Sequence, residues 1–187
     1  PNLPANIAAR VVDNSRRKRR GAIRRAYLAA INAARRTVLI ENAYFLPDRA
    51  IRRAMARAVS RGCEIAVIVP GRSDVRAVEY AGLYIYRWFV RRGIRILRWT
   101  GPMMHAKTAV VDGMWSTIGS YNLDARSLRY NLEVIVEIID ADVGAEMEAQ
   151  FRVDERMTTP FALATWESFA WWRKALAWLA FRFRSWL

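Results

Sequence analysis

A short stretch in the second half of the chain carries side chains that could handle a phosphate group. It contains His105, the single histidine of the 187 residues, and Lys107, in a chain whose basic residues are otherwise almost all arginine. An imidazole can act as a nucleophile or as a general acid, and a compact ammonium binds anionic oxygens. Ser120 and Asn122 can donate hydrogen bonds to such oxygens, and Gly119 lets the backbone come close to a ligand. The set predicts a phosphate-binding site built around a histidine.

Hydrophobic alternation and turn residues predict how this stretch folds. Met104–Val111 has the pattern of a strand, Asp112 and Gly113 suit a tight turn, and Met114–Ile118 returns as a second strand. Because side chains alternate along a strand, His105 and Lys107 are expected on one face, about 6 to 7 Å apart. The alternative is a purely structural histidine on a half-buried strand. The presence of a lysine two residues later, in a chain that otherwise uses arginine, favours the functional interpretation.

The spacing of these residues resembles a known signature. Written as H-x-K-x4-D-x6-G-S/T-x-N, with Asp112 as its acid, it is similar to the motif of the phospholipase D superfamily. The run NLDARS at 122–127, followed by NLE at 131–133, resembles bacterial cardiolipin synthases, most of all their C-terminal half. With YFLPD at 44–48 and PGRSD at 70–74, the resemblance covers residues 37 to about 150.

The resemblance implies a two-step phosphoryl transfer without a metal ion or other cofactor. One histidine attacks a phosphodiester, a second protonates the departing alcohol, and so two H-K-D motifs are needed. This chain has one, and the other would come from a missing upstream domain or from a second copy in a homodimer. Lys107, Ser120 and Asn122 would hold the nonbridging oxygens, and Glu133 would orient a catalytic histidine, either His105 or the histidine of the other half. Asp112 belongs to the motif, although its place at a turn favours a structural role.

Three functions remain open from the sequence. The first is a phosphatidyltransferase of cardiolipin synthase type at the bacterial cytoplasmic membrane, acting on phosphatidylglycerol. The second is a homodimeric single-motif nuclease or phosphodiesterase, and the third is a lipid-binding relic without activity. For the first, we expect the substrate to be bound with help from four further positions: Tyr44, Arg72, Arg126 and Gly119.

Charge and composition restrict the partners. The chain has 31 lysines and arginines against 17 acidic residues, a net charge of +14 that predicts an anionic partner. Nucleic acid and an anionic lipid surface explain this charge equally well. The single Cys63 is expected to be a small buried apolar residue, and without a Cys/His cluster we expect no zinc site. A chain that starts at Pro1 without a signal peptide or a long apolar run is expected to be a fragment of a longer protein.

The periodicities along the chain predict an α/β fold, a phospholipase D-like sandwich in which helices flank a central mixed β-sheet. We expect residues 1–157 to form this domain and residues 158–187 to form an amphipathic tail, rich in tryptophan and arginine, that lies in a membrane interface or packs on protein. The run SRRKRR at 15–20 is expected to be a solvated loop. Loops 42–45, 71–74 and 100–103 should gather beyond the strand ends. The expected strands are 8–12, 37–41, 64–69, 94–99, 104–111, 114–118 and 132–139, and the expected helices are 21–36, 48–61, 75–92 and 142–156.

Overall fold

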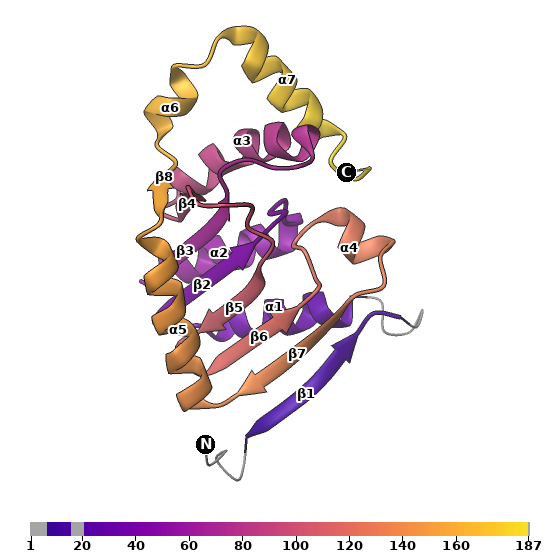
Figure 1. Ribbon diagram of the computed structural model, residues 1–187, viewed down its shortest axis with the longest axis vertical. Helices are drawn as coiled ribbons and strands as arrows, with labels where there is room; N and C mark the ends of the chain where they lie inside the picture. Colours follow the sequence, from indigo (N-terminus) through magenta and orange to yellow (C-terminus); the bar gives the residue numbers. More distant parts are fainter. Residues whose placement is uncertain (1–6, 16–20, 187) are drawn as a thin grey trace.

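The computed structural model describes residues 7–15 and 21–186, and these residues form a mixed α/β structure around an eight-stranded sheet. The strand order is β1-β7-β6-β5-β2-β3-β4-β8, with β2, β3 and β4 parallel and the other pairs antiparallel (Figure 1). This confirms the predicted fold class. The strands are β1 Ala8–Asp13, β2 Thr37–Asn42, β3 Glu64–Pro70, β4 Arg95–Trp99, β5 Lys107–Val111, β6 Trp115–Gly119, β7 Val134–Ile139 and β8 Thr158–Pro160.

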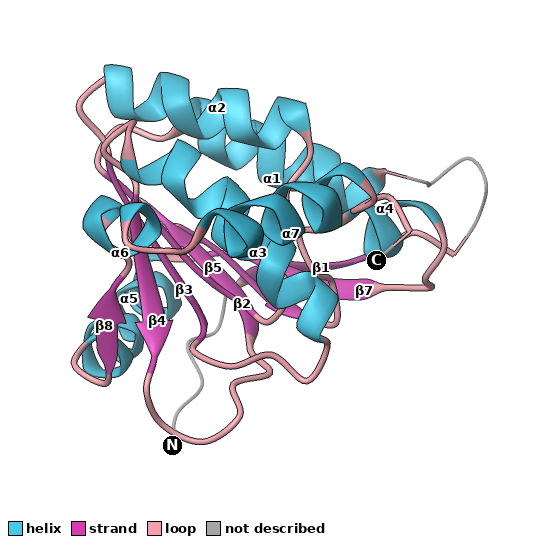
Figure 2. Ribbon diagram, turned by 90° about the horizontal axis from the view of Figure 1, so that it is seen from above, coloured by secondary structure: helices cyan, strands magenta, loops and turns pink. Residues whose placement is uncertain are grey.

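Helices cover both faces of the sheet. On one face, α1, α2, α3 and α7 enclose the larger core, which includes the fully buried Tyr27, Phe45 and Phe89 (Figure 2). On the other face, α5 closes a smaller core with Leu39 and Phe151. The helices are α1 Ala22–Ala33, α2 Arg49–Ser60, α3 Arg76–Val90, α4 Ala125–Arg129, α5 Ala141–Glu155, α6 Leu163–Glu167 and α7 Trp171–Arg182.

Helix α2 shows how the sequence sets these elements. The carboxylate of Asp48 caps its first turn by accepting hydrogen bonds from the backbone N–H groups of Ala50 and Ile51, at 2.6 and 3.1 Å. Ile51 and Met55 then fall one turn apart on the buried side. The arginines of the helix therefore fall on its outer side.

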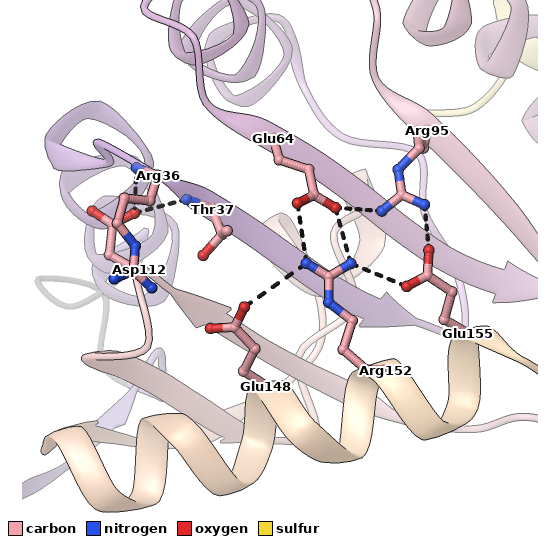
Figure 3. A network of polar contacts seen from close by, with 8 residues as sticks. All are labelled: Arg36, Thr37, Glu64, Arg95, Asp112, Glu148, Arg152 and Glu155. Carbon is pink, nitrogen blue, oxygen red and sulfur yellow. Dashed lines mark hydrogen bonds and ion pairs between the residues drawn. The ribbon is translucent and has the colours of Figure 1, made fainter.

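A network of charged side chains attaches α5 to the sheet (Figure 3). Arg152 on α5 bonds to Glu64 at the start of β3 at 2.9 and 3.1 Å, and to Glu155 on its own helix at 3.0 Å. Arg95 at the start of β4 pairs with both Glu64 and Glu155. Two arginines thus share two carboxylates, which fixes the end of α5 against the starts of two parallel strands.

The C-terminal segment continues the domain. Strand β8 pairs with β4, and Phe161 and Trp166 are buried in the larger core. Helix α7 packs on α3, with Ala177 buried between them and the ring of Phe181 5.0 Å from that of Tyr84. The boundary after residue 157 stays a prediction, although residues on both sides of it share one core.

Element ends differ from the sequence predictions in ways that matter for the site. The predicted strand 104–111 begins only at Lys107, so His105 precedes the strand; likewise the predicted strand 132–139 begins at Val134. The short elements α4 and β8 were not predicted. Residues 16–20 of the basic run lie outside the described residues. Within the described ranges, each helix is too short or too polar to cross a bilayer.

Candidate active site at the ends of β2 and β5

The His105 segment is fixed by its backbone. The N–H of Ala43, just after β2, donates to the carbonyl of Ala106 at 3.1 Å, and Asn42 pairs with Lys107 in the β2–β5 ladder. His105 is exposed at this edge, with the Tyr44 ring edge-on at 6.3 Å between ring centres. The sequence analysis expected strand alternation to place His105 and Lys107 on one face. That argument does not apply, because β5 begins at Lys107 and His105 lies outside it.

Lys107 is buried directly behind the histidine. Its ammonium donates a hydrogen bond to the carbonyl of His105 at 2.9 Å, and only 8% of the residue is exposed. Burial lowers its pKa below the ordinary lysine value, while the nearby carboxylates of Glu133, Asp124 and Asp74 act in the opposite direction. The result is a positive charge held in one place beside the histidine.

Asn122 is positioned by a residue that the sequence analysis did not single out. The fully buried side chain of Asn42 accepts from the N–H of Leu123 at 3.0 Å and donates to the carbonyl of Tyr121 at 3.4 Å. These two hydrogen bonds fix the backbone of the residues on either side of Asn122. The side chain of Asn122 is itself buried, and its Oδ1 has no hydrogen-bond partner among the described residues.

Ser120 and Glu133 form one network. The hydroxyl of Ser120 donates to one carboxylate oxygen of Glu133, and Ser127 and Asn131 donate to the other at 2.8 and 3.1 Å. Asn14 accepts from the backbone N–H of Glu133 at 2.7 Å. Within the described chain, no hydrogen bond joins Glu133 to His105, so the predicted carboxylate–histidine contact is absent inside this copy.

Asp112 lies apart from these residues, at the other end of β5. Its carboxylate accepts hydrogen bonds from the backbone N–H groups of Arg35, Arg36 and Thr37 at 2.8, 2.8 and 2.9 Å, and its φ is 56°. Figure 3 draws Asp112 with Arg36 and Thr37. It therefore ties the β5–β6 turn to the start of β2. These contacts fit the structural role that its turn position favours, and its part in the chemistry of the motif stays a prediction.

Gly119 is required by the sheet itself. A Cβ at this position would lie 2.2 Å from the carbonyl oxygen of Val134 and 2.7 Å from the Cα of Ile135, both on the neighbouring β7. The close approach of β6 and β7 is by itself enough to require a glycine here. The predicted approach of a ligand to Gly119 stays a prediction.

The loops after β2, β3 and β4 gather as predicted. The hydroxyl of Tyr44 donates to both oxygens of Asp74 at 2.7 and 2.9 Å. Loops 71–74 and 100–103 line a pocket of about 580 Å³, which includes Arg72, and a neighbouring pocket of about 320 Å³ is lined by His105. Arg126, also predicted to bind substrate, is exposed on α4 and lines neither pocket.

A buried carboxyl group beside the histidine pocket was missed by the sequence analysis. Glu41 lines the same pocket as His105 and Asp154, and its Oε1 has no hydrogen-bond partner among the described residues. Burial raises its pKa to about 7, with a smaller contribution from the charge of Asp154. Sequence alone gave no signal, because an acid at the end of an apolar strand reads as a solvent-facing residue.

Comparison with known proteins agrees with this architecture. Residues 27–155 match the family model described as "Cardiolipin synthase, PLD-like domain". The chain is 36% identical over 129 residues to cardiolipin synthase A of Pseudomonas syringae pv. syringae, covering 68% of this chain and 27% of that protein. It is 35% identical over 137 residues to cardiolipin synthase B of Escherichia coli, covering 73% and 33%. The chain thus spans about a quarter to a third of these relatives.

Solved structures share the fold at low sequence identity. The phospholipase D family member Nuc from Salmonella typhimurium matches with a TM-score of 0.71 and 18% identity, over 83% of this chain and 99% of that one. Phosphatidylserine synthase from Haemophilus influenzae matches with a TM-score of 0.71 and 15% identity, over 98% and 47%. The family model covers most of the chain, and so the chain belongs to the phospholipase D-like domain family of cardiolipin synthases.

Proposed function

We propose that this chain supplies one half of the active site of a phosphatidyltransferase of cardiolipin synthase type. The observation that carries the proposal is the arrangement at the start of β5, where the buried ammonium of Lys107 bonds to the carbonyl of the exposed His105. A nucleophile that is open to substrate thereby sits beside a fixed positive charge. The names of the relatives favour a lipid substrate.

The first step would move a phosphatidyl group onto the protein. A ring nitrogen of His105 bonds to the phosphorus of phosphatidylglycerol, and the bond from phosphorus to the departing glycerol oxygen breaks. A second histidine gives that oxygen its proton. Lys107 and the Nδ2 group of Asn122 would donate hydrogen bonds to the nonbridging oxygens. The buried Oδ1 of Asn122 has no partner among the described residues, and as an acceptor it could take a hydrogen bond from a donor outside this chain.

The second step would release the product. A hydroxyl group of another phosphatidylglycerol attacks the phosphohistidine, the nitrogen–phosphorus bond breaks, and the second histidine takes up the hydroxyl proton. Since His105 is the only histidine here, that second residue has to come from another domain or another copy. Glu133 would orient the histidine of that other half, which fits a carboxylate that has no hydrogen bond to His105 within the described residues.

Helix α7 supports action at a lipid surface. Its side toward α3 carries the buried Ala177 and the half-buried Phe181, whereas its outer side is apolar and exposed. Tryptophan side chains favour the boundary between water and lipid. We therefore place the protein at the surface of the bacterial cytoplasmic membrane, with phosphatidylglycerol as substrate. The exposed residues are Trp171, Trp172, Leu176, Trp178, Leu179 and Phe183.

A homodimeric nuclease of the same superfamily is the second candidate. The net charge of +14 and the fold shared with Nuc favour it. It predicts a different substrate at the same residues: a His105-dependent cleavage of DNA by a dimer, without transfer to a lipid.

The experiment compares turnover of phosphatidylglycerol and of DNA by wild type and His105→Ala, in the assembly that contains two H-K-D motifs. Met114→Ala, an exposed change at the hairpin turn, is the matched control. We expect lipid transfer that His105→Ala abolishes and Met114→Ala preserves. Residual lipid activity within tenfold of wild type in His105→Ala, or turnover by a monomer with one motif, would show the proposal to be wrong. DNA cleavage without lipid transfer would select the nuclease.

A further inference from the structure

A large groove on the helical face of the protein is lined by eight arginines among its eighteen lining residues. It has a volume of about 1280 Å³ and lies between α1, α2, α4 and the end of α7. None of the candidate catalytic residues lines it, yet α4 connects the two regions. Ser127 on α4 bonds to Glu133, while Leu128 and Arg129 face the groove. We call this feature the arginine groove.

The charged residues that line the arginine groove are almost all positive. Eight arginines line it, and among its described lining residues Asp48 is the only acid. That carboxylate is already used, because it pairs with Arg24 and caps α2. The eight are Arg24, Arg25, Arg49, Arg53, Arg57, Arg129, Arg182 and Arg184.

Like charges in and beside the groove act on one another. Burial lowers the pKa of Arg184, and the charges of Arg182 and Arg129 lower it further. Arg52, next to the groove, has its pKa lowered by burial and by Arg184, and its Nε is buried without a hydrogen-bond partner among the described residues. Gathering guanidinium groups in this way costs free energy, which an anion in the groove would offset.

The surroundings of the groove favour a lipid over nucleic acid. Along α7, Trp171, Trp178 and Arg182 follow at intervals of seven and four residues, so they lie on one stripe that leads into the groove. Trp171 is 80% and Trp178 52% exposed. Aliphatic Leu176 and Leu179, exposed on the same outer side, suit acyl chains and offer nothing to a base.

We propose that the arginine groove binds the phosphate of an anionic phospholipid in a membrane surface, apart from the lipid that reacts at His105. The apolar outer side of α7 would enter the boundary of the bilayer, and the groove beside it would take headgroup phosphates. This inference rests on the proposed action at a lipid surface, but it concerns binding and needs no turnover. It also assigns a role to the outward arginines of α2.

The test is co-sedimentation of the whole chain with vesicles of phosphatidylglycerol and phosphatidylcholine. The groove variant replaces the exposed Arg49, Arg53 and Arg129 by glutamine. The control variant makes the same change of charge at the exposed Arg35, Arg91 and Arg156, which lie outside the groove. Near an anionic leaflet each surface arginine contributes about fivefold in affinity, so we expect the groove variant to bind at least about tenfold more weakly. The control should change by less than about threefold.

Three further binding measurements identify the ligand of the groove. Pure phosphatidylcholine vesicles should bind both variants alike. Soluble glycerol 3-phosphate, matched in phosphate concentration, should leave wild type on the vesicles; displacement would mean a free phosphate site and overturn the proposal. Duplex DNA binding should fall no further in the groove variant than in the control; a larger loss for DNA than for vesicles would identify nucleic acid as the occupant.

The remaining outcomes are equally decisive. Equal losses of vesicle affinity in the groove and control variants would show that the net charge attracts the membrane without a specific site. No loss of affinity in either variant would show that the groove does not bind lipid. Both results overturn the proposal. If the triple variant melts below wild type, Arg53→Gln alone is compared with Arg35→Gln, with an expected loss of about fivefold. Failure of lipid turnover would leave these binding results unaffected, so the two proposals can fail separately.

Discussion

The ammonium of Lys107 donates a hydrogen bond to the backbone carbonyl of His105 across 2.9 Å. This bond joins the side chain of the first residue of β5 to the backbone of the exposed histidine two residues earlier, so it holds the buried charge next to that histidine. The partner is a carbonyl group, and the positive charge therefore remains available to an anionic oxygen of the substrate.

Replacing Lys107 should separate catalysis from stability. We expect Lys107→Met to lose at least about 100-fold in kcat/KM, because an oxyanion donor is removed. Its unfolding free energy should stay within about 1 kcal/mol of wild type, since loss of the hydrogen bond is offset by relief of a buried charge. Lys107→Arg should also be poorly active, because a planar guanidinium does not fit the space of an ammonium. Steady-state kinetics and urea unfolding test this, and activity of Lys107→Met within tenfold of wild type would refute it.

Asn42 should act as a positioning residue. Asn42→Ala leaves the N–H of Leu123 and the carbonyl of Tyr121 without partners in a buried place, at a cost of about 2 to 4 kcal/mol. The backbone around Asn122 should loosen, so KM should rise in addition. Asn32→Ala, at an exposed position on α1, is the control and should change stability by less than about 0.5 kcal/mol. Equal stability of the two variants would contradict the role of Asn42.

The motif aspartate should affect folding more than chemistry. Asp112→Ala removes an acceptor for three backbone N–H groups and places alanine at a φ of 56°. We expect a loss of roughly 2 to 4 kcal/mol in unfolding free energy. The kcat of the folded fraction should stay within about threefold, because Asp112 lies at the far end of β5. A large fall in kcat at unchanged stability would return Asp112 to the catalytic set.

Glu41 should make the protein less stable as the pH rises. Its pKa is raised from the ordinary value of 4.5 to about 7, so the folded state holds a proton that the unfolded state gives up. The stability tied to this proton is fully present below pH 4.5 and is lost as the pH rises through about 7, by on the order of 3 kcal/mol at most. Glu41→Gln should remove this loss and be the more stable protein at pH 8. Thermal unfolding of both proteins across this range is the test, and parallel pH profiles would contradict it.

Much of this molecule could be predicted from its residues, and the limits have physical reasons. Hydrophobic periodicity located the long helices and buried strands, and Asp48 marked the start of α2 because a cap is a local feature. Strand ends could not be located as well, and so His105 was placed inside β5. The roles of Asn42 and Glu41 depend on which segments meet in space, which no local pattern records.

The glycine and the tail illustrate the same limit. The glycine at position 119 indicated that some other group lies close to the backbone there. Only the pairing of β6 with β7 shows that the backbone of β7 does so. The tail was predicted to be amphipathic. On α7, Trp171, Trp172 and Trp178 are exposed while the small Ala177 faces α3, whereas Trp166 of the same tail is buried in the larger core. Composition could not decide this orientation, because the partner surface on α3 lies far away in the sequence.

The account depends most on a covalent bond between phosphorus and His105. The direct measurement is a denaturing quench at alkaline pH of the two-motif assembly during turnover of phosphatidylglycerol labelled in its phosphate, followed by peptide mapping without exposure to acid. We predict label on the peptide that contains His105, through a bond that is stable in base and is hydrolysed in acid, and no trapped label in His105→Ala. Label that persists at wild-type level in His105→Ala, or active wild-type enzyme without any trapped label, would contradict the account.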